Sequence, residues 1–238
     1  MCTLIVFFRA YDDAPLIVAA NRDERLDRPA RPPFAWEGED FVAPRDEVAL
    51  GTWMGVNRSG VFVGITNRHQ AFVDAQRPSR GRLVVEALRQ GSARDAFERM
   101  RQYDGGDENG FHLVMADSEA AYLVWGDGER THEAELEPGV HVVTERSFDA
   151  APTEREPRIR ARVEAMTEAP GDEALVRLLT LQEDGGGFDD VTVHVPDFNY
   201  GTRSASIVRL GAEPVFRHAA GPPTTTGFED FSQLLRRR

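Results

Sequence analysis

Residues 1–8, Met-Cys-Thr-Leu-Ile-Val-Phe-Phe, place the one cysteine of the chain, Cys2, directly before an apolar run. The run is rich in β-branched and aromatic residues, and it predicts a strand over residues 2–8. A turn at residues 12–15 leads to a second apolar segment, residues 16–20, which also predicts a strand. The continuous apolar character of both segments indicates strands that are buried on two faces.

The position of Cys2 also suggests a chemical role. Aminopeptidases remove an initiator methionine when the second residue is small, and cysteine qualifies. The processed chain would then begin with a cysteine whose α-amine, with an ordinary pKa of about 7.7–8.0, can accept the thiol proton at neutral pH. Nucleophile and base would belong to one residue. The alternative is that Cys2 packs as a small hydrophobic residue. The strand behind it favours the nucleophile, because it would anchor the terminus.

Composition narrows the possible classes of protein. With 238 residues, 41% of them hydrophobic, we expect one domain over residues 1–238 with a short tail from about residue 219. The net charge of −12 argues against nucleic acid and anionic membranes as partners. All 28 cationic side chains are arginine, which excludes lysine Schiff-base chemistry and Walker-type phosphate loops. One cysteine forms no internal disulfide, which fits the cytoplasm, and no apolar run is long enough to span a membrane.

Hairpins dominate the remainder of the chain, and the predicted helices occur in blocks. This arrangement favours an α+β fold over a doubly wound parallel sheet. The predicted elements are an ordered surface loop (22–44), hairpins (52–66, 111–125 and 204–218), a helical stretch broken near Gly91 and Ser92 (81–101), a strand (139–144), two helices (156–167 and 172–182), a flexible loop (183–190) and a short amphipathic helix (228–235).

Several motifs occur in a fixed order along the chain. They are Met1-Cys2-Thr3-Leu4, Ala20-Asn21-Arg22-Asp23-Glu24, Gly51-Thr52-Trp53-Met54-Gly55-Val56-Asn57, Ile65-Thr66-Asn67-Arg68, Ser79-Arg80-Gly81 and Tyr200-Gly201-Thr202-Arg203-Ser204. In these motifs the sequence resembles the NRDE family, which includes the transport-and-Golgi-organisation-2 proteins. That family in turn resembles the N-terminal-nucleophile (Ntn) hydrolases of the penicillin V acylase and bile-salt hydrolase type. The resemblance implies a four-layer αββα sandwich of two antiparallel sheets flanked by helices, with the cysteine heading a central strand.

The resemblance also implies roles for individual residues. Cys2 would be the nucleophile, Asn67 an oxyanion-stabilising amide, and Arg203 the arginine that orients the amino terminus. Aligned without gaps, Asn21 and Glu24 occupy the arginine and aspartate positions of the acylases, so Arg22 and Asp23 would supply those charges from adjacent positions. The chain departs from the family at residues 142–145, where Val-Val-Thr-Glu stands in place of the family's usual Gly-Leu-Ser-Asn tract. The carboxylate of Glu145 would oppose an oxyanion, whereas an amide would stabilise it.

Structural alternatives accompany these roles. Asn21 could cap a turn, Arg22 and Asp23 could form a surface ion pair of little energetic value, and Asn67 could be a turn residue. Thr202 and Ser204 place hydrogen-bonding side chains on either side of Arg203, which favours a functional role there. The histidines show no metalloprotease spacing, and no metal site is expected.

Two functions remain open at this point. The first is an Ntn-type hydrolase that acts on a small-molecule amide or other acyl substrate, through Cys2, Asn67, Arg203, Arg22 and Asp23, with Asn21, Glu24, His69, Thr202 and Ser204 as binding residues. The second is a non-catalytic protein that binds or transports haem or a lipid-like ligand. The resemblance suggests haem, and His69 or Cys2 would then be its axial ligand. No other cofactor is expected.

Overall fold

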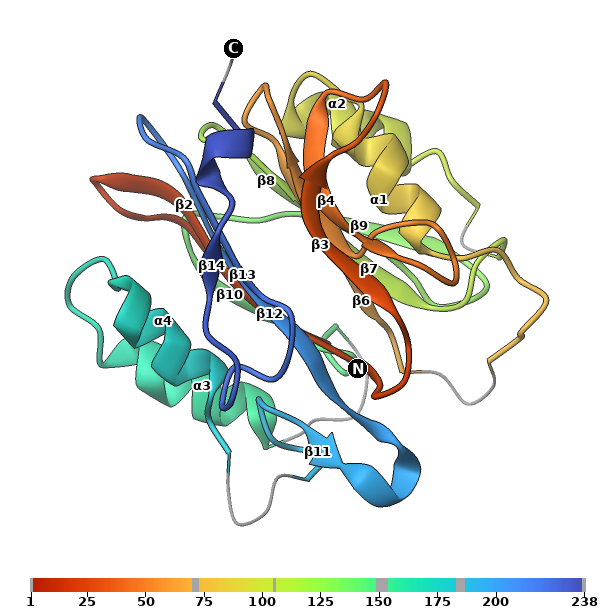
Figure 1. The fold of residues 1–238 in the computed structure, drawn as a ribbon. Helices are drawn as coiled ribbons and strands as arrows, with labels where there is room; N and C mark the ends of the chain where they lie inside the picture. Colours follow the sequence, from red (N-terminus) through yellow and green to blue (C-terminus); the bar gives the residue numbers. More distant parts are fainter. Residues whose placement is uncertain (1, 70–72, 105, 149–153, 183–186, 237–238) are drawn as a thin grey trace.

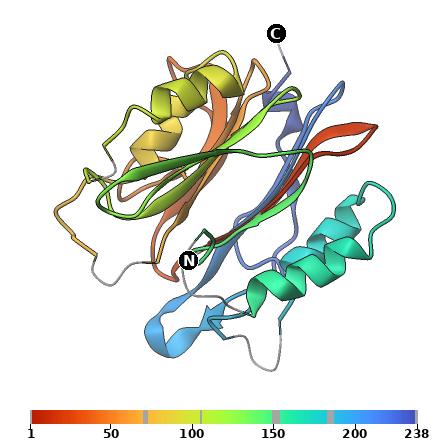
Figure 2. The same cartoon turned by 180° about the vertical axis from the view of Figure 1, so that it is seen from behind.

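The computed structural model describes residues 2–69, 73–104, 106–148, 154–182 and 187–236. Within these residues, two seven-stranded antiparallel sheets lie face to face, and helices cover the outer face of each (Figures 1 and 2). The architecture is therefore the four-layer αββα sandwich, and the α+β prediction is confirmed.

The first sheet holds the strand of Cys2. Its order is β10-β1-β2-β12-β13-β14, with β11 paired to β12. The apolar residues of β2 alternate between two cores: Leu16 and Val18 face the second sheet, whereas Ile17 and Ala19 face the helices. This explains the continuous apolar run. The strands are β1 (Cys2–Tyr11), β2 (Ala14–Arg25), β10 (Gly139–Val143), β11 (His194–Val195), β12 (Tyr200–Leu210), β13 (Val215–Ala219) and β14 (Glu229–Asp230).

The second sheet is a meander in which each strand pairs with the next along the chain. Phe62 and Val114 contribute to the core between the sheets, and Val63 and Leu113 to the core beneath the helices. The strands are β3 (Ala30–Ala35), β4 (Phe41–Asp46), β5 (Met54–Asn57), β6 (Phe62–Asn67), β7 (Phe111–Ala116), β8 (Ala121–Gly126) and β9 (Thr131–Glu135).

The helices form one pair on each side of the sandwich. Helices α1 (Gly81–Leu88) and α2 (Ala93–Met100) cover the second sheet, and α3 (Arg155–Glu164) and α4 (Asp172–Leu179) cover the first (Figure 2). The predicted break between α1 and α2 is confirmed, because the side chain of Ser92 accepts a hydrogen bond from the Asp95 backbone N–H and caps α2. No described helix is both long and apolar enough to cross a membrane.

Two sequence predictions are wrong. Residues 22–44 do not form a loop: β2 continues to Arg25, and β3 and β4 follow within the same stretch. Pro32 and Pro33 hid β3, which tolerates them because it is an edge strand whose register shifts between Arg31 and Phe34.

The second wrong prediction concerns residues 228–235, which do not form an amphipathic helix. They contain β14 and the short 3₁₀ turn Ser232–Leu234 instead. The Phe231 backbone N–H donates to the Phe216 carbonyl at 2.8 Å, which ties this segment to β13. Part of the predicted loop 183–190, residues 183–186, lies outside the described residues.

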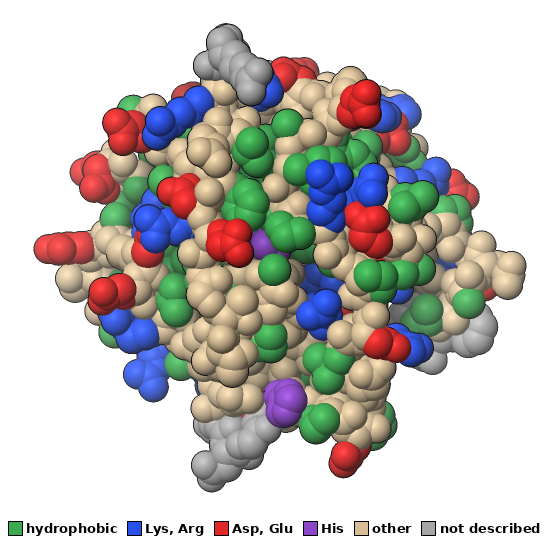
Figure 3. All heavy atoms as spheres, in the orientation of Figure 1, with side chains coloured by type: hydrophobic (Ala, Val, Ile, Leu, Met, Phe, Trp, Pro, Cys, Tyr) green, Lys and Arg blue, Asp and Glu red, His purple; other side chains and the backbone are tan. Residues whose placement is uncertain are grey.

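Charged side chains of both signs are interspersed with apolar ones on the face shown in Figure 3. The acidic side chains that give the chain its negative net charge are thus not gathered into one patch on that face.

Candidate functional site

Cys2 begins β1 on the side of the sheet that turns toward the second sheet. Leu4 and Val6, two and four residues further along, lie on the same side and belong to the core between the sheets. At the end of this core lies a cavity of about 160 Å³, which Cys2 lines. The strand therefore places the sulfur in a cavity. The other lining residues include Arg22, Asp23, Glu24, Asp46, Trp53, Asn67 and Arg80.

The thiol of Cys2 is in its protonated form at neutral pH. Burial raises its pKa above the ordinary value, and the Asp23 carboxylate acts in the same direction. A backbone hydrogen bond from Asp23 and the Arg22 guanidinium oppose this shift, but they do not outweigh burial. Attack by this sulfur on a carbonyl carbon therefore requires a base that takes the thiol proton.

Arg22 lies opposite Cys2 in the pairing of β1 with β2, and only 5% of its side chain is exposed. Its Nη2 donates to Asp46 Oδ2 at 2.6 Å, and its guanidinium carbon lies 4.4 Å from the centre of the Trp53 ring. Its Nη1 is buried and has no hydrogen-bond partner among the described residues. One donor of a fixed cation is therefore left for a ligand at the cavity.

Asp46 fixes the position of Arg22, and the Asp46 carboxylate is in turn fixed by other hydrogen bonds. It accepts hydrogen bonds from Arg28 Nε at 2.7 Å and from the Ala49 backbone N–H at 2.8 Å. Desolvation opposes the charged form of Asp46, yet these bonds and the two arginines lower its pKa overall. The Asp46 carboxylate is thus ionised and shared between Arg22 and Arg28.

Asp23 faces the helical side of the sheet as well as the cavity. Its Oδ1 accepts a hydrogen bond from Thr202 Oγ1 at 2.7 Å. Its Oδ2 is buried without a hydrogen-bond donor among the described residues, and Arg155 Nη1 lies 3.6 Å away. Burial raises the pKa of this carboxyl, and the Arg155 charge opposes the rise.

Arg155, which contacts Asp23 from behind the cavity lining, was not predicted from the sequence. Its side chain is 1% exposed, and Nη1 lies 3.3 Å from both Glu145 Oε2 and Thr3 Oγ1. Its Nη2 donates to the Phe188 carbonyl. One signal could have found it: Arg155 precedes Ile159 by four residues, on the buried face of α3.

The contact with Arg155 also gives the Glu145 carboxylate a structural role, as the partner of a buried cation. This carboxylate is neutralised by a buried cation, and Glu145 is not among the residues that line the cavity of Cys2. It therefore does not face the position that an oxyanion would occupy there.

The structure separates the other predicted site residues into two groups. Asn67, at the end of β6, and Glu24 line the cavity with Cys2, whereas Arg203 does not. Arg203 Nη2 donates to the Arg28 carbonyl at 3.4 Å. His69 is exposed and also lies outside the lining.

Asn21 and Ser204 are buried away from the cavity lining. The Nδ2 of Asn21 donates to the carbonyls of Leu179 at 2.9 Å and Val191 at 2.8 Å, so it ties β2 to the chain that follows α4. The Ser204 hydroxyl is buried without a hydrogen-bond partner among the described residues. The described residues contain no group of three or more His, Cys, Asp or Glu side chains arranged to hold a metal ion.

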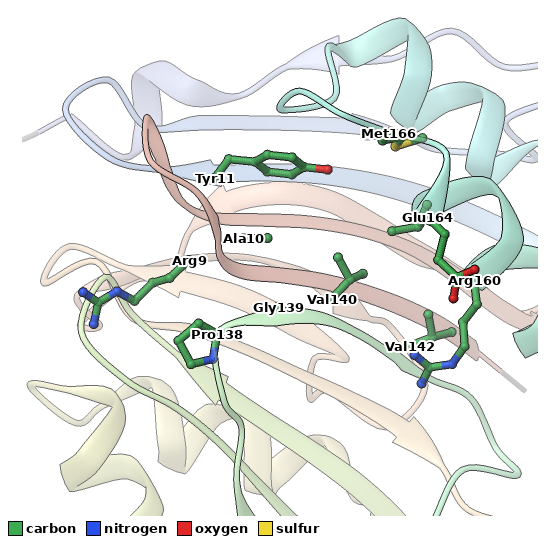
Figure 4. A pocket seen from close by; sticks show the side chains of 11 residues that line it. Arg9, Ala10, Tyr11, Pro138, Gly139, Val140, Val142, Arg160, Glu164 and Met166 are labelled. Carbon is green, nitrogen blue, oxygen red and sulfur yellow. The ribbon is translucent and has the colours of Figure 1, made fainter.

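A larger hollow of about 460 Å³ lies at the other end of β1 (Figure 4). Arg9, Tyr11, Pro138, Arg160 and Met166 are among its lining residues, which include no cysteine or histidine. At about 3.3 Å per residue, this end of the strand lies roughly 25 Å from Cys2. The two hollows are therefore separate, and only the smaller one contains a nucleophile.

Comparison with known proteins identifies relatives along nearly the whole chain. The sequence model of the Transport and Golgi organisation 2 family matches residues 1–214. The bovine Transport and Golgi organization protein 2 homolog is 26% identical over 253 aligned positions, which cover 90% of each chain. The human homolog is 31% identical over 132 positions, which cover 51% of this chain and 47% of the human protein.

Solved structures of similar fold include an acid amidase, a bile acid hydrolase and an acylase. The Caenorhabditis elegans ortholog of N-acylethanolamine-hydrolyzing acid amidase superposes with a TM-score of 0.59 at 14% identity, covering 87% of this chain and 92% of that one. A mutant of conjugated bile acid hydrolase from Clostridium perfringens gives 0.59 at 10% identity, covering 100% and 95%. Penicillin V acylase from Agrobacterium tumefaciens gives 0.53 at 14% identity, covering 99% and 88%. At these identities the likeness concerns the fold, which is that of Ntn hydrolases. By the family match over residues 1–214, the chain belongs to the Transport and Golgi organisation 2 family.

Proposed function

We propose that this protein is an N-terminal-cysteine hydrolase or acyltransferase that acts on a small amide or another acyl compound, in the reducing cytoplasm. The observation that carries the proposal is the placement of Cys2 at the head of an interior strand, between β10 and β2, in a cavity that Arg22, Asp23 and Asn67 also line. The names of three solved structures with a similar fold, an acid amidase, an acylase and a bile acid hydrolase, support this class of reaction.

The proposed reaction begins once the initiator methionine has been removed. The α-amine of Cys2 takes the thiol proton, and the sulfur attacks the carbonyl carbon of the substrate. Asn67 donates to the resulting oxyanion, and the fixed guanidinium of Arg22 adds a positive field. The carbon–nitrogen bond then breaks, and the leaving amine takes the proton from the Cys2 ammonium. Water attacks the thioester in the same way, and it releases the carboxylic acid and regenerates the thiol.

Asp23 would hold the α-amine in this scheme. Its buried Oδ2 has no hydrogen-bond donor among the described residues, and Asp23 lines the cavity with Cys2. A buried carboxylate oxygen without a donor is costly, by about 1–3 kcal/mol. An ammonium group next to it would supply both a donor and a charge.

The geometry favours acyl chemistry over haem binding. Pockets that enclose a drug-sized ligand usually measure about 300–1,000 Å³, whereas the cavity at Cys2 measures about 160 Å³. This space accommodates a reacting group and its neighbours. His69, the other proposed haem ligand, is exposed and lies outside the cavity lining.

The test compares the wild type with Cys2→Ala on a panel of N-acyl amides and acyl esters. We expect turnover of at least one compound by the wild type and none above background by Cys2→Ala. Asn67→Ala should lower kcat about 10²–10³-fold, the usual effect of removing one oxyanion donor. Equal rates for wild type and Cys2→Ala on every compound would refute catalysis. A saturable haem absorbance shift in its place would support the binding alternative.

A further inference from the structure

Arg80 is a cation at the cavity of Cys2 that the proposed reaction does not use. It belongs to the Ser79-Arg80-Gly81 motif and lines the cavity together with its two neighbours in sequence. Among the described residues its guanidinium makes one hydrogen bond, from Nη1 to the Gly110 carbonyl at 2.8 Å, and no ion pair. Burial lowers the pKa of Arg80, while Cys2 and Glu24 oppose this shift, which places the guanidinium within the electrostatic reach of both.

The fold fixes Arg80 at this position. Arg80 immediately precedes α1, and Gly81 packs against the backbone of residues 51 and 52. A Cβ atom at Gly51 would lie 2.9 Å from the Gly81 carbonyl carbon, so the two segments approach as closely as glycine allows. Arg80 is therefore held at the rim by a close backbone contact rather than by a carboxylate.

The carboxylates of the cavity are already directed at other cations. Asp46 is shared between Arg22 and Arg28, as described above. The Glu24 carboxylate lies 3.9 Å from Arg22 and 3.8 Å from Arg28. Among the cations that line the cavity, the guanidinium of Arg80 then has no carboxylate partner among the described residues, and the buried Nη1 of Arg22 has no hydrogen-bond partner among them.

We propose that Arg80, together with Nη1 of Arg22, binds a carboxylate of the substrate. The site would then prefer acyl compounds that carry a carboxylate close to the scissile carbonyl. This inference rests on the proposed function and adds the substrate class to it. Guanidinium groups suit the role because their planar N–H donors match both oxygens of a carboxylate. In a partly desolvated cavity such a pair is stronger than in water.

The experiment uses two substrates with the same acyl chain, an N-acylglycine and the corresponding N-acylethanolamine, which differ in the carboxylate. We expect the wild type to prefer the N-acylglycine at least tenfold in kcat/KM, and Arg80→Gln to reduce this ratio about tenfold. The matched control is Arg89→Gln at the other end of α1, where the arginine is 54% exposed and pairs with Glu39. This control should retain the preference.

A binding measurement separates this inference from the proposed function. With Cys2→Ala protein, calorimetry should show N-acylglycine binding at least tenfold more tightly than the ethanolamide, with the difference lost when Arg80→Gln is added. If turnover depends on Cys2 but the two substrates react alike, or if Arg80→Gln leaves the ratio unchanged, the anion site is wrong and the hydrolase stands. If no turnover depends on Cys2, the hydrolase is wrong. The calorimetric comparison then decides the anion site: equal binding of the two compounds overturns it, and a tenfold difference that requires Arg80 supports it.

Discussion

Replacement of Arg155 by methionine is the most informative test of the buried charges beside Cys2. Methionine keeps the length and apolar stem of the side chain but removes the cation that faces Asp23 and Glu145. Those carboxylates are 0% and 7% exposed, so each would lose its charge partner in a desolvated environment. Breaking a buried ion pair from one side costs about 3–5 kcal/mol. Against a typical total stability of about 5–15 kcal/mol, this loss is large.

The assay is urea denaturation followed by circular dichroism, with the free energy of unfolding extrapolated to water. Arg160→Met on the same helix is the control, because that arginine is 46% exposed and pairs with Glu156 at 2.7 Å on the surface. We expect it to cost less than about 1 kcal/mol. Adding Glu145→Gln to Arg155→Met should recover at least about 1 kcal/mol, because one uncompensated charge is removed.

The pH dependence of the Arg155→Met deficit gives a second readout. Without Arg155, the pKa of Asp23 should rise further above its unfolded value. The folded variant then binds more protons than its unfolded state, and its deficit relative to the wild type should shrink as pH falls from 7 toward 4. Equal costs for Arg155→Met and Arg160→Met, or a deficit independent of pH, would contradict a charged buried cluster.

Three further predictions concern stability and the support of the site. Burial lowers the pKa of His112 to about 4 and of His218 to about 3, so the unfolded state binds more protons below pH 6.5. The unfolding free energy should therefore fall by about 2 kcal/mol per histidine between pH 7 and pH 5; a flat urea midpoint over this range would contradict it. Gly81→Ala brings a Cβ within 3.0 Å of backbone and should lower both the melting temperature and Cys2-dependent activity, whereas Gly171→Ala, where a Cβ meets open space, should change neither. Asp46→Asn should reduce kcat/KM about tenfold, equivalent to about 1.4 kcal/mol, because its bond to an arginine of the cavity loses charge; unchanged kinetics would show that this support is dispensable.

Local signals in the sequence predicted most strands and the four helices. The apolar runs of β1 and β2 and the capping serine of α2 act within a few residues, so a short window contains their cause. Strand β3 could not be predicted from its own residues, because the tolerance of its prolines depends on whether the strand lies at an edge. Edge position is a property of the whole sheet and is not visible in residues 30–35.

Part of the candidate site's geometry could be predicted from the sequence. Cys2, Arg22, Asp23, Glu24 and Asn67 do line one cavity. The alternation of side chains along β2 separates Asn21 from Arg22, but it would also have excluded Asp23, which lines the cavity.

The role of Arg155 could not be predicted because its partners lie far from it in sequence. Thr3 and Asp23 lie on β1 and β2, and they meet α3 only when the helical layer packs on the sheet. An arginine on the apolar face of a helix was the one local sign of a buried partner.

The central claim is that the sulfur of Cys2 acts as a nucleophile on a chain whose initiator methionine has been removed. Intact-protein mass spectrometry after rapid quenching with an activated acyl ester tests it most directly. We predict a chain that lacks one methionine residue and carries a single acyl group on the cysteine, with no acyl group on Cys2→Ala. A chain that retains its methionine, or that acquires the same label in both proteins, would contradict the claim.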